Sequence, residues 1–549
     1  MIRFGCTVFL LCLTAAAAAA PAPDAAQALA SISAAELAAP IKVLSADAFG
    51  GRAPATPGEV KSIDYLRSQF QAMGLKPGWH DSYLQPVPLT QITAEPADLA
   101  VSGGGKTMDL RYLRDQVILT EREQPLVTLK NNPMIFVGYG IDAPGYDWND
   151  FAGVDVRGKT IVVLVNDPGY ADPKLFNGKD MTYYGRWTYK YEEAARQGAA
   201  AVLIVHQDGP AGYGWGVVQN SWSGVKFTLA EPDGNMHRAA IEGWINHATA
   251  LALFRQAGLD FAALEQAADK PGFRAVPMNL NLSVTLHSDI VHKLSHNVVA
   301  VLPGSSHPGE AVVYSAHWDH LGTHPELPGD HIFNGAVDDG SGDAALLALA
   351  KAFALLHPRP RRSVIFLATT SEEQGLLGAA WYVRHPLVPL ARTVADINMD
   401  IMNVYGRTRD LTVIGYGKSQ LEDDLAAAAK AEGMGITPDP HPETGLYYRA
   451  DHFEFAKRGV PAILSFSGYD YVDRPAGWGQ AAWAEYFAHH YHKPADEFDP
   501  HWDLSGLAQQ VRALFRLGLG LADSDAWPDW YPGVPFKTLR DAGAAQRAQ

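Results

Sequence analysis

The sequence predicts an α/β fold: a three-layer αβα sandwich with a mostly parallel central sheet, plus an inserted β-rich domain. First, 549 residues are too many for one hydrophobic core, so two or three domains are expected. Second, short apolar strands alternate with helices over 298–521, as in parallel sheets covered on both faces. Third, 134–284 is rich in Gly, Tyr and Trp and in strand-like stretches.

These changes of pattern divide the chain into five segments. They are a signal peptide (1–20), the N-terminal part of the main domain (21–115), the inserted domain (116–285), the remainder of the main domain (286–525) and a C-terminal tail (526–549). The first segment has a positive start, an apolar stretch and then small alanines, which is typical of a cleaved secretory signal. We therefore expect an exported protein, periplasmic or secreted, without stable membrane insertion after cleavage.

Composition excludes several classes of protein. The net charge is −16, so nothing indicates nucleic-acid binding, and an anionic membrane surface would repel the chain. Both cysteines, Cys6 and Cys12, lie in the signal, so the mature chain has no disulfide, no thiolate metal ligand and no cysteine nucleophile. Nothing in the sequence indicates an oligomeric state.

The N-terminal part of the main domain is predicted to be helical before its first strand. A helix over 58–73 has apolar residues on one face and ends at Gly74. A glycine-rich turn precedes this helix, and we interpret Gly51 and Arg52 there as a turn with a surface charge. The strand-like stretches that follow, including those of the inserted domain, are 83–89, 99–101, 135–140, 160–165, 199–205, 227–229 and 278–284, with one helix at 190–197.

The main domain resumes with regular alternation. Strands are expected at 298–302, 311–316, 363–369, 394–401, 410–414 and 460–466, and helices at 343–356, 375–385, 420–432, 451–458 and 504–521. The helix that begins at Asp343 is apolar nearly all round, which indicates burial, and Asp343 is expected to cap it.

Metal-binding residue types follow several of these strands. His317 and Asp319 come directly after the strand 311–316, at the strand end where active sites of α/β sheets usually lie. A histidine whose ring is fixed by a nearby carboxylate is typical of a metal ligand. The same residue types recur in a glycine-rich loop, after the next strand, within an apolar strand and in a late loop: Asp338, Asp339, Glu372, Glu373, Asp400 and His492.

Two histidines and several carboxylates are thus predicted to meet at one edge of one sheet. Mixed histidine and carboxylate ligation suits zinc, and this number of carboxylates suits two metals that share a bridging aspartate. Each residue alone has an ordinary alternative. His492, for example, follows His489 and His490, and all three could form a surface cluster.

This ordered set of motifs resembles that of the di-zinc aminopeptidase family. The family includes bacterial leucyl aminopeptidase, aminopeptidase Y, the glutamate carboxypeptidase II group and the non-catalytic transferrin receptor. The matching segments are His317-Trp318-Asp319, Gly335-Ala336-Val337-Asp338-Asp339, Glu372-Glu373, Asp400 and His492. The insertion is similar to a protease-associated domain in its position and in three glycine features, Gly138-Tyr139-Gly140, Gly158-Lys159 and Gly198-Ala199-Ala200.

The resemblance implies two Zn²⁺ ions as cofactors and a role for each matching residue. Asp338 would bridge the ions, with His317 and Asp400 completing one site and Glu373 and His492 the other. Asp319 would hold the His317 ring, and Glu372 would be the general base. Tyr447 lies where the family often places a hydroxyl near the developing oxyanion, with Tyr448 and Tyr491 as alternatives.

The function implied is an exported zinc aminopeptidase that removes N-terminal residues from peptides. A glutamate-type carboxypeptidase or dipeptidase on the same scaffold is the alternative, and it needs cationic residues for an acidic substrate. The candidates for such residues are Arg407, Arg409 and Arg449. A receptor-like binding module is a third possibility, but such a module would be expected to lack ligands or the base, and none is missing here.

Overall fold

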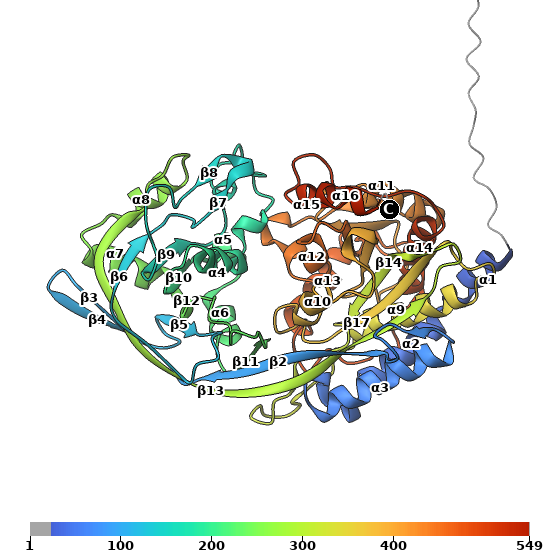
Figure 1. Ribbon diagram of the computed structural model, residues 1–549. Coiled ribbons are helices and arrows are strands. Elements are labelled where there is room, and N and C mark those ends of the chain that lie inside the picture. The colour runs from blue at the N-terminus through green and yellow to red at the C-terminus, as the bar shows by residue number, and fades with distance from the viewer. Residues whose placement is uncertain (1–22, 548–549) are drawn as a thin grey trace, which may run out of the picture.

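The computed structural model describes residues 23–547. The predicted signal peptide at 1–20 lies outside the described residues. The chain forms two units, which lie side by side on a long curved ribbon of strands (Figure 1). Within the described part of the chain, every helix is too short or too polar to span a bilayer.

The first unit is built around a mostly parallel sheet, as predicted. β14 (His307–His317) runs parallel to β17 (Arg362–Thr369) on one side and to β18 (Thr393–Asn398) on the other. β21 (Ala462–Ser467) continues the parallel order beyond β18. The edges are mixed, because β19 (Asp410–Ile414) lies antiparallel to β21, and β13 lies antiparallel to β17.

Side chains of the central strands alternate between two hydrophobic cores, one on each face of the sheet. Val312, Tyr314 and Ala316 point into the first core, whereas Ala311 and Val313 point into the second. The first core is covered by α2 (Ala34–Leu44), α3 (Pro57–Ala72), α9 (Gly340–Ala354) and α14 (Ser505–Ala522), and the second by α10 (Leu377–Tyr382) and α12 (His452–Ala456). The three-layer sandwich is therefore confirmed.

The second unit contains its own sheet and its own pair of cores. Its central strands are β6 (Leu126–Phe136), β9 (Thr160–Leu164), β10 (Ala201–His206) and β12 (Ile241–Asn246), flanked by α4 (Trp187–Arg196), α7 (His247–Gln256) and α8 (Phe261–Ala268). One of these cores takes buried side chains from Leu99 onward, and the other from Val117 onward. Its assignment to the protease-associated type stays a prediction.

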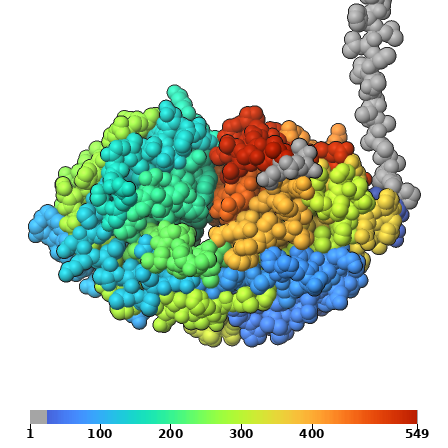
Figure 2. All heavy atoms as spheres, in the orientation of Figure 1, coloured from blue at the N-terminus to red at the C-terminus, as the bar shows by residue number. Residues whose placement is uncertain are grey.

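Two long strands connect the units. β13 (Val276–Leu302) is 27 residues long and pairs first with β6, then with β2 (Leu84–Ala94) and finally with β17. β11 (Val225–Leu229) of the inserted unit pairs with the other edge of β2. The connection is therefore a hydrogen-bonded ribbon, and Figure 2 shows an opening between the two units above it.

The remaining helices and strands complete the two units. They are α1 (Pro23–Ser31), β1 (Lys76–Pro77), β3 (Leu99–Gly103), β4 (Lys106–Leu110), β5 (Gln116–Leu119), β7 (Asp142–Ala143), β8 (Trp148–Asn149), α5 (Asp208–Ala211), α6 (Trp215–Ser221), β15 (Gly322–Thr323), β16 (Ile332–Phe333), α11 (Leu421–Ala431), β20 (Gly435–Pro438), α13 (Trp478–His489), α15 (Lys537–Ala542) and α16 (Ala544–Arg547).

The short helical turn η1 (Asp47–Arg52) corrects one interpretation of the sequence. Arg52 is not a surface charge, because its side chain is completely buried between η1 and the first unit. Gly51 has a φ of 66°, and a Cβ placed on it would lie 2.3 Å from the carbonyl oxygen of Gly322 and 2.6 Å from that of Phe333. Only glycine allows the turn to lie this close to β15 and β16.

We expect Gly51→Ala to lower the free energy of unfolding by about 1–3 kcal/mol, because a methyl group there adds a backbone clash to an unfavourable φ. Gly74→Ala is the matched control: its φ is 75°, but nothing lies within 4 Å of the added Cβ. Urea denaturation of both variants tests the difference. Equal losses of stability in the two variants would contradict the close contact.

Candidate metal centre

The predicted ligands come together at one edge of the central sheet. His317 is the last residue of β14, Glu373 follows β17, and Asp400 lies two residues after β18. Because these three strands are parallel, their C-terminal ends meet at the same edge. Asp338 comes from the loop before α9, and His492 from the loop after α13.

Asp338 lies between the two histidines. Its Oδ1 is 3.2 Å from Nε2 of His317, and its Oδ2 is 3.1 Å from Nε2 of His492. His492 Nε2 is also 3.1 Å from Oε2 of Glu373, whereas His317 Nε2 is 3.8 Å from Oδ1 of Asp400. The donors therefore fall into two groups that share one carboxylate, as expected for two cations held by a bridging aspartate.

These residues fit zinc in three respects: their donor atoms, their buried negative charge and their hydrogen bonding. Asp400 Oδ1 is buried without a hydrogen-bond partner among the described residues. Among the described residues, the carboxylates of Asp338, Glu372, Glu373 and Asp400 (the cluster) form ion pairs with histidines and not with lysine or arginine. Buried carboxylates at this density are costly without a cation, and nitrogen and oxygen donors are those that Zn²⁺ prefers.

The carboxylates control the pKa values of both histidines. Burial alone lowers the pKa of His492, but Glu373 and Asp338 outweigh it and raise the pKa to about 10. Burial likewise lowers the pKa of His317, yet Glu372, Asp338 and Asp400 raise it well above its usual range. In the metal-free protein the carboxylates therefore favour the protonated form of both rings.

Zinc binding is expected to release a proton from each of these two rings at pH 7, because a ligating imidazole must be neutral. The apparent zinc affinity should therefore rise with pH above 7, up to the pKa of about 10 of His492. Titration calorimetry in two buffers of different ionisation enthalpy measures the protons released. An affinity that does not change between pH 7 and pH 9 would contradict the assignment of both rings as ligands.

Asp319 supports the centre mainly through its main chain. Nδ1 of His317 lies 3.1 Å from the carbonyl oxygen of Asp319 and 3.9 Å from its carboxylate. The carboxylate instead accepts a hydrogen bond of 3.0 Å from the backbone N–H of Glu372. Asp319 therefore links the His317 ring to the segment that carries the predicted base.

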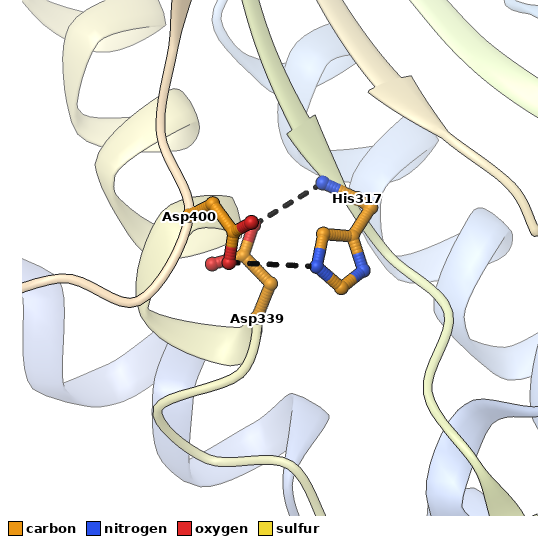
Figure 3. Close-up of side chains that lie close together, drawn as sticks. All are labelled: His317, Asp339 and Asp400. Atoms are coloured by element: carbon orange, nitrogen blue, oxygen red, sulfur yellow. Dashed lines mark hydrogen bonds and ion pairs between the residues drawn. The ribbon is translucent and has the colours of Figure 1, made fainter. Parts of the chain in front are cut away.

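Asp339 links the same strand end to helix α9. Its Oδ1 accepts a hydrogen bond of 2.9 Å from the Gly342 N–H and so caps the helix, while its Oδ2 accepts one of 3.2 Å from the His317 N–H. Figure 3 shows Asp339, His317 and Asp400 converging from three segments. The expectation that Asp343 caps this helix was wrong, because Asp343 lies within the first turn and its carboxylate is buried.

His320 is a functional candidate that sequence reasoning missed. It is buried, and its Nδ1 lies 2.7 Å from Oε1 of Glu373. His320, Asp338 and Glu373 together form a group of donors close enough to hold a metal ion. The available signal was its position three residues after His317, at the same strand end.

Glu372, the predicted base, lies beside the predicted ligands. Its Oε2 lies 4.0 Å from His317 Nε2, farther than the carboxylates of Asp338 and Asp400, and its side chain is 10% exposed. Burial raises the pKa of Glu372 well above its usual range, and Glu373 and Asp400 add to that effect against the opposing charge of His317. Ser371, directly before it, has a φ of 56°, a strained conformation of the kind found at functional sites.

Tyr491, rather than Tyr447, lies beside the cluster. The ring of Tyr491 stacks on His492 with the ring centres 3.8 Å apart. Burial raises its pKa well above the usual range, and the carboxylates of the cluster add to the effect, namely Asp338, Glu373, Asp400 and Glu372.

Tyr447 is surrounded by a different set of groups. Its ring packs against His452 at 4.6 Å, and Nζ of Lys418 lies 5.2 Å from the ring centre. Its hydroxyl is buried without a hydrogen-bond partner among the described residues. Besides burial, the charges that raise its pKa are those of Glu422 and Asp396, outside the cluster. The role of Tyr447 at the oxyanion stays a prediction.

A three-layer α/β fold with histidines and carboxylates gathered around a shared aspartate is typical of metal-dependent hydrolases. Residues 297–515 match the model of Peptidase family M28. The matched segment begins within β13 and includes every predicted ligand.

Several known proteins are similar to parts of the chain. Aminopeptidase NAALADL1 of Mus musculus is 34% identical over 139 residues, which is 24% of this chain and 17% of that protein. Probable glutamate carboxypeptidase AMP1 of Arabidopsis thaliana is 32% identical over 213 residues, 37% of this chain and 28% of that protein. A probable leucine aminopeptidase 2 of Aspergillus oryzae is 27% identical over 229 residues, 40% of this chain and 43% of that protein. The matches thus span less than half of each relative.

Solved structures support the fold over a longer part of the chain. The aminopeptidase from Aneurinibacillus sp. strain AM-1 superposes with a TM-score of 0.50 at 21% identity. The alignment covers 92% of this chain and 97% of that one. At this identity the likeness establishes a shared fold, in agreement with the α/β architecture predicted from the sequence.

Proposed function

We propose that the protein is an exported, zinc-dependent aminopeptidase that hydrolyses the N-terminal peptide bond of peptides. The observation that carries the proposal is the position of Asp338, which directs one oxygen to His317 and the other to His492, with Glu372 beside them. The match of residues 297–515 to the model of Peptidase family M28 supports peptide hydrolysis. The signal-like N-terminal sequence supports export.

The residues divide between binding and proton transfer. His317 and Asp400 would hold one Zn²⁺, and Glu373 and His492 the other, with Asp338 shared between them. Bound zinc supplies Lewis acidity, which lowers the pKa of water and polarises a carbonyl group. Glu372 accepts the proton of the attacking water and delivers it to the leaving amine.

We assign the stabilisation of the developing oxyanion to Tyr491. Its ring is fixed by stacking on His492, and its phenol keeps its proton in the field of the surrounding carboxylates. A hydroxyl donor directed at the reacting carbonyl group would stabilise the negative charge that forms in the transition state. Tyr491→Phe would keep the stacking and remove only the donor, so it separates this role from packing.

Aminoacyl-nitroanilides test the proposed activity directly. Purified protein is assayed for bound metal and for hydrolysis, before and after removal of metal by a chelator. We expect about two zinc ions per chain and activity that zinc restores after chelation. Acetylation of the substrate's α-amino group should abolish hydrolysis. Protein that binds no metal and hydrolyses nothing would favour the binding-module alternative.

A pair of arginines at the boundary between the units gives the carboxypeptidase alternative a specific basis. Arg186 precedes α4 in the inserted unit, and its side chain is largely buried with Nε lacking a hydrogen-bond partner among the described residues. Burial, and then the charge of Arg449, lowers the pKa of Arg186 to about 9. A buried cation beside another cation is costly unless an anion lies nearby.

The C-terminal carboxylate of a short peptide would supply such an anion. Of the other cationic candidates, Arg409 pairs with Asp470 at 3.0 Å, and Arg407 lines a separate groove beside α14. Peptide pairs with a free or an amidated C-terminus distinguish the two functions. A carboxypeptidase or dipeptidase should lose most of its activity on the amidated peptide, and Arg186→Gln should abolish that preference, whereas an aminopeptidase should hydrolyse both peptides similarly.

A further inference from the structure

A single buried guanidinium joins three separate segments next to the metal centre. Arg52 donates from Nε to the carbonyl oxygen of Trp318 at 2.8 Å and from Nη2 to that of Gly335 at 2.8 Å. Its Nη1 donates to the carbonyl oxygens of Asn334 at 2.5 Å and Leu44 at 3.0 Å. All four acceptors are main-chain groups, so this arginine fixes the path of the backbone rather than a particular side chain.

Two of these segments carry the ligands. Trp318 lies between His317 and Asp319 at the end of β14, and Gly335 begins the loop that leads to Asp338. Arg52 therefore ties the backbone beside His317 to the backbone that leads to the shared carboxylate. The distance from His317 to Asp338 depends on how these two segments lie relative to each other.

The same loop is held from its other side by a buried carboxylate. Asp496 is 1% exposed, and its side chain accepts hydrogen bonds from the N–H groups of Val337 at 3.0 Å and Asp338 at 3.1 Å. Its carbonyl oxygen accepts a further bond of 2.9 Å from the N–H of Ala336. The loop 334–338 thus has a cation on its carbonyl groups and an anion on its N–H groups.

Arg52 also supplies positive charge where negative charge accumulates. Asp343, Asp496, Asp338 and Asp339 all interact electrostatically with its guanidinium. A planar fork with five donors suits several carbonyl groups held at fixed angles, which the three donors of a lysine ammonium do not match. Both the geometry and the charge of the Arg52 guanidinium therefore stabilise the observed conformation of the loop 334–338.

We infer that Arg52 is a positioning residue of the metal centre, which sets the relative placement of His317 and Asp338 and thereby the zinc affinity. The inference rests on the metal centre of the proposed function. Residues that orient ligands typically change metal affinity by about 10–100-fold when they are replaced. A purely structural role would instead lower stability without changing the affinity of the folded protein.

Arg540 offers a matched control for the purely structural role. It is 3% exposed and donates to the main-chain carbonyl oxygens of Thr393, Val394 and Pro528 at 3.0–3.1 Å. Thr393 begins β18, whereas Asp400 follows its other end, so Arg540 makes the same kind of contacts away from the metal centre.

The test compares Arg52→Gln, Arg52→Lys and Arg540→Gln in the full chain. Zinc affinity is measured by competition with a chelating dye, and thermal stability is measured without metal. We expect both glutamine variants to be less stable than the wild type. Arg52→Gln alone should weaken zinc binding, by about 10–100-fold, and Arg52→Lys should fall between it and the wild type.

Wild-type zinc affinity in Arg52→Gln would overturn this inference alone, and so would an equal weakening in Arg540→Gln. If Arg52→Gln does not fold, the affinity of Arg52→Lys decides in the same way. Wild-type protein that binds no zinc would overturn the proposed function and this inference with it.

Discussion

Glu372→Gln is expected to leave zinc binding intact and to reduce kcat by about 10²–10⁴-fold. The amide has nearly the shape of the carboxylate but cannot take up a proton from water. Glu372 lies farther from His317 than Asp338 or Asp400 does, at 4.0 Å, so the ligand set does not depend on it. KM should change little, because the substitution removes a transition-state function rather than a binding contact.

Steady-state kinetics with an aminoacyl-nitroanilide and metal analysis of the same sample check this result. Glu485→Gln is a suitable control, since its side chain is 67% exposed on α13. Wild-type turnover in Glu372→Gln would show that another group acts as the base. Loss of metal together with activity would show that Glu372 is a ligand.

Asp338→Ala is expected to abolish high-affinity zinc binding at both positions and, with it, all measurable activity. Each of its oxygens lies within 3.2 Å of a different histidine, so the change removes a donor from both groups at once. In excess zinc the variant should also unfold at a lower temperature. At a zinc concentration of 100 Kd, bound metal stabilises a protein by about 2.7 kcal/mol per site, and the variant would lose this contribution.

Thermal unfolding with excess zinc and with chelator separates the loss of stabilisation by bound zinc from a direct effect of the substitution on the metal-free protein. The difference in Tm between wild type and Asp338→Ala should be larger in zinc than in chelator. Asp473→Ala, at an exposed aspartate, controls for a general effect of removing negative charge. Retention of two zinc ions by Asp338→Ala would exclude a shared ligand at this position.

The fold was predictable where the structural signal is local. Alternation of apolar strands and helices gave the parallel sheet, and parallel order brings His317, Glu373 and Asp400 to one edge. The strand expected at 394–401 ends earlier, at Asn398, so Asp400 lies beyond the strand rather than within it. Its placement at the sheet edge did not depend on that boundary.

The supporting groups were not predictable because their roles depend on tertiary contacts. Arginine is mostly exposed, and only the packing of η1 against β15 and β16 shows that Arg52 is buried. His320 has no distinctive spacing, and Asp339 acts as the cap only because the loop directs it back toward Gly342. In the same way, Tyr447 and Tyr491 could not be separated without knowing which of them stacks on His492.

The longest strand was predicted only at its two apolar ends, 278–284 and 298–302. The segment between them is polar and lacks the alternation of a half-buried strand. It is extended because β2 pairs with it residue for residue, from Ser288–Ala94 to Val298–Leu84. Backbone pairing with a distant segment thus determined a conformation that its side chains do not indicate.

That pairing also limits how the molecule can be divided. Cutting the chain between the two units would leave β2 without β11 on one edge, and β13 without β6 over its first half. Unpaired strand edges of this kind are templates for aggregation. The inserted unit therefore cannot be deleted without exposing these strand edges. A shortened protein would need other residues to cover both edges.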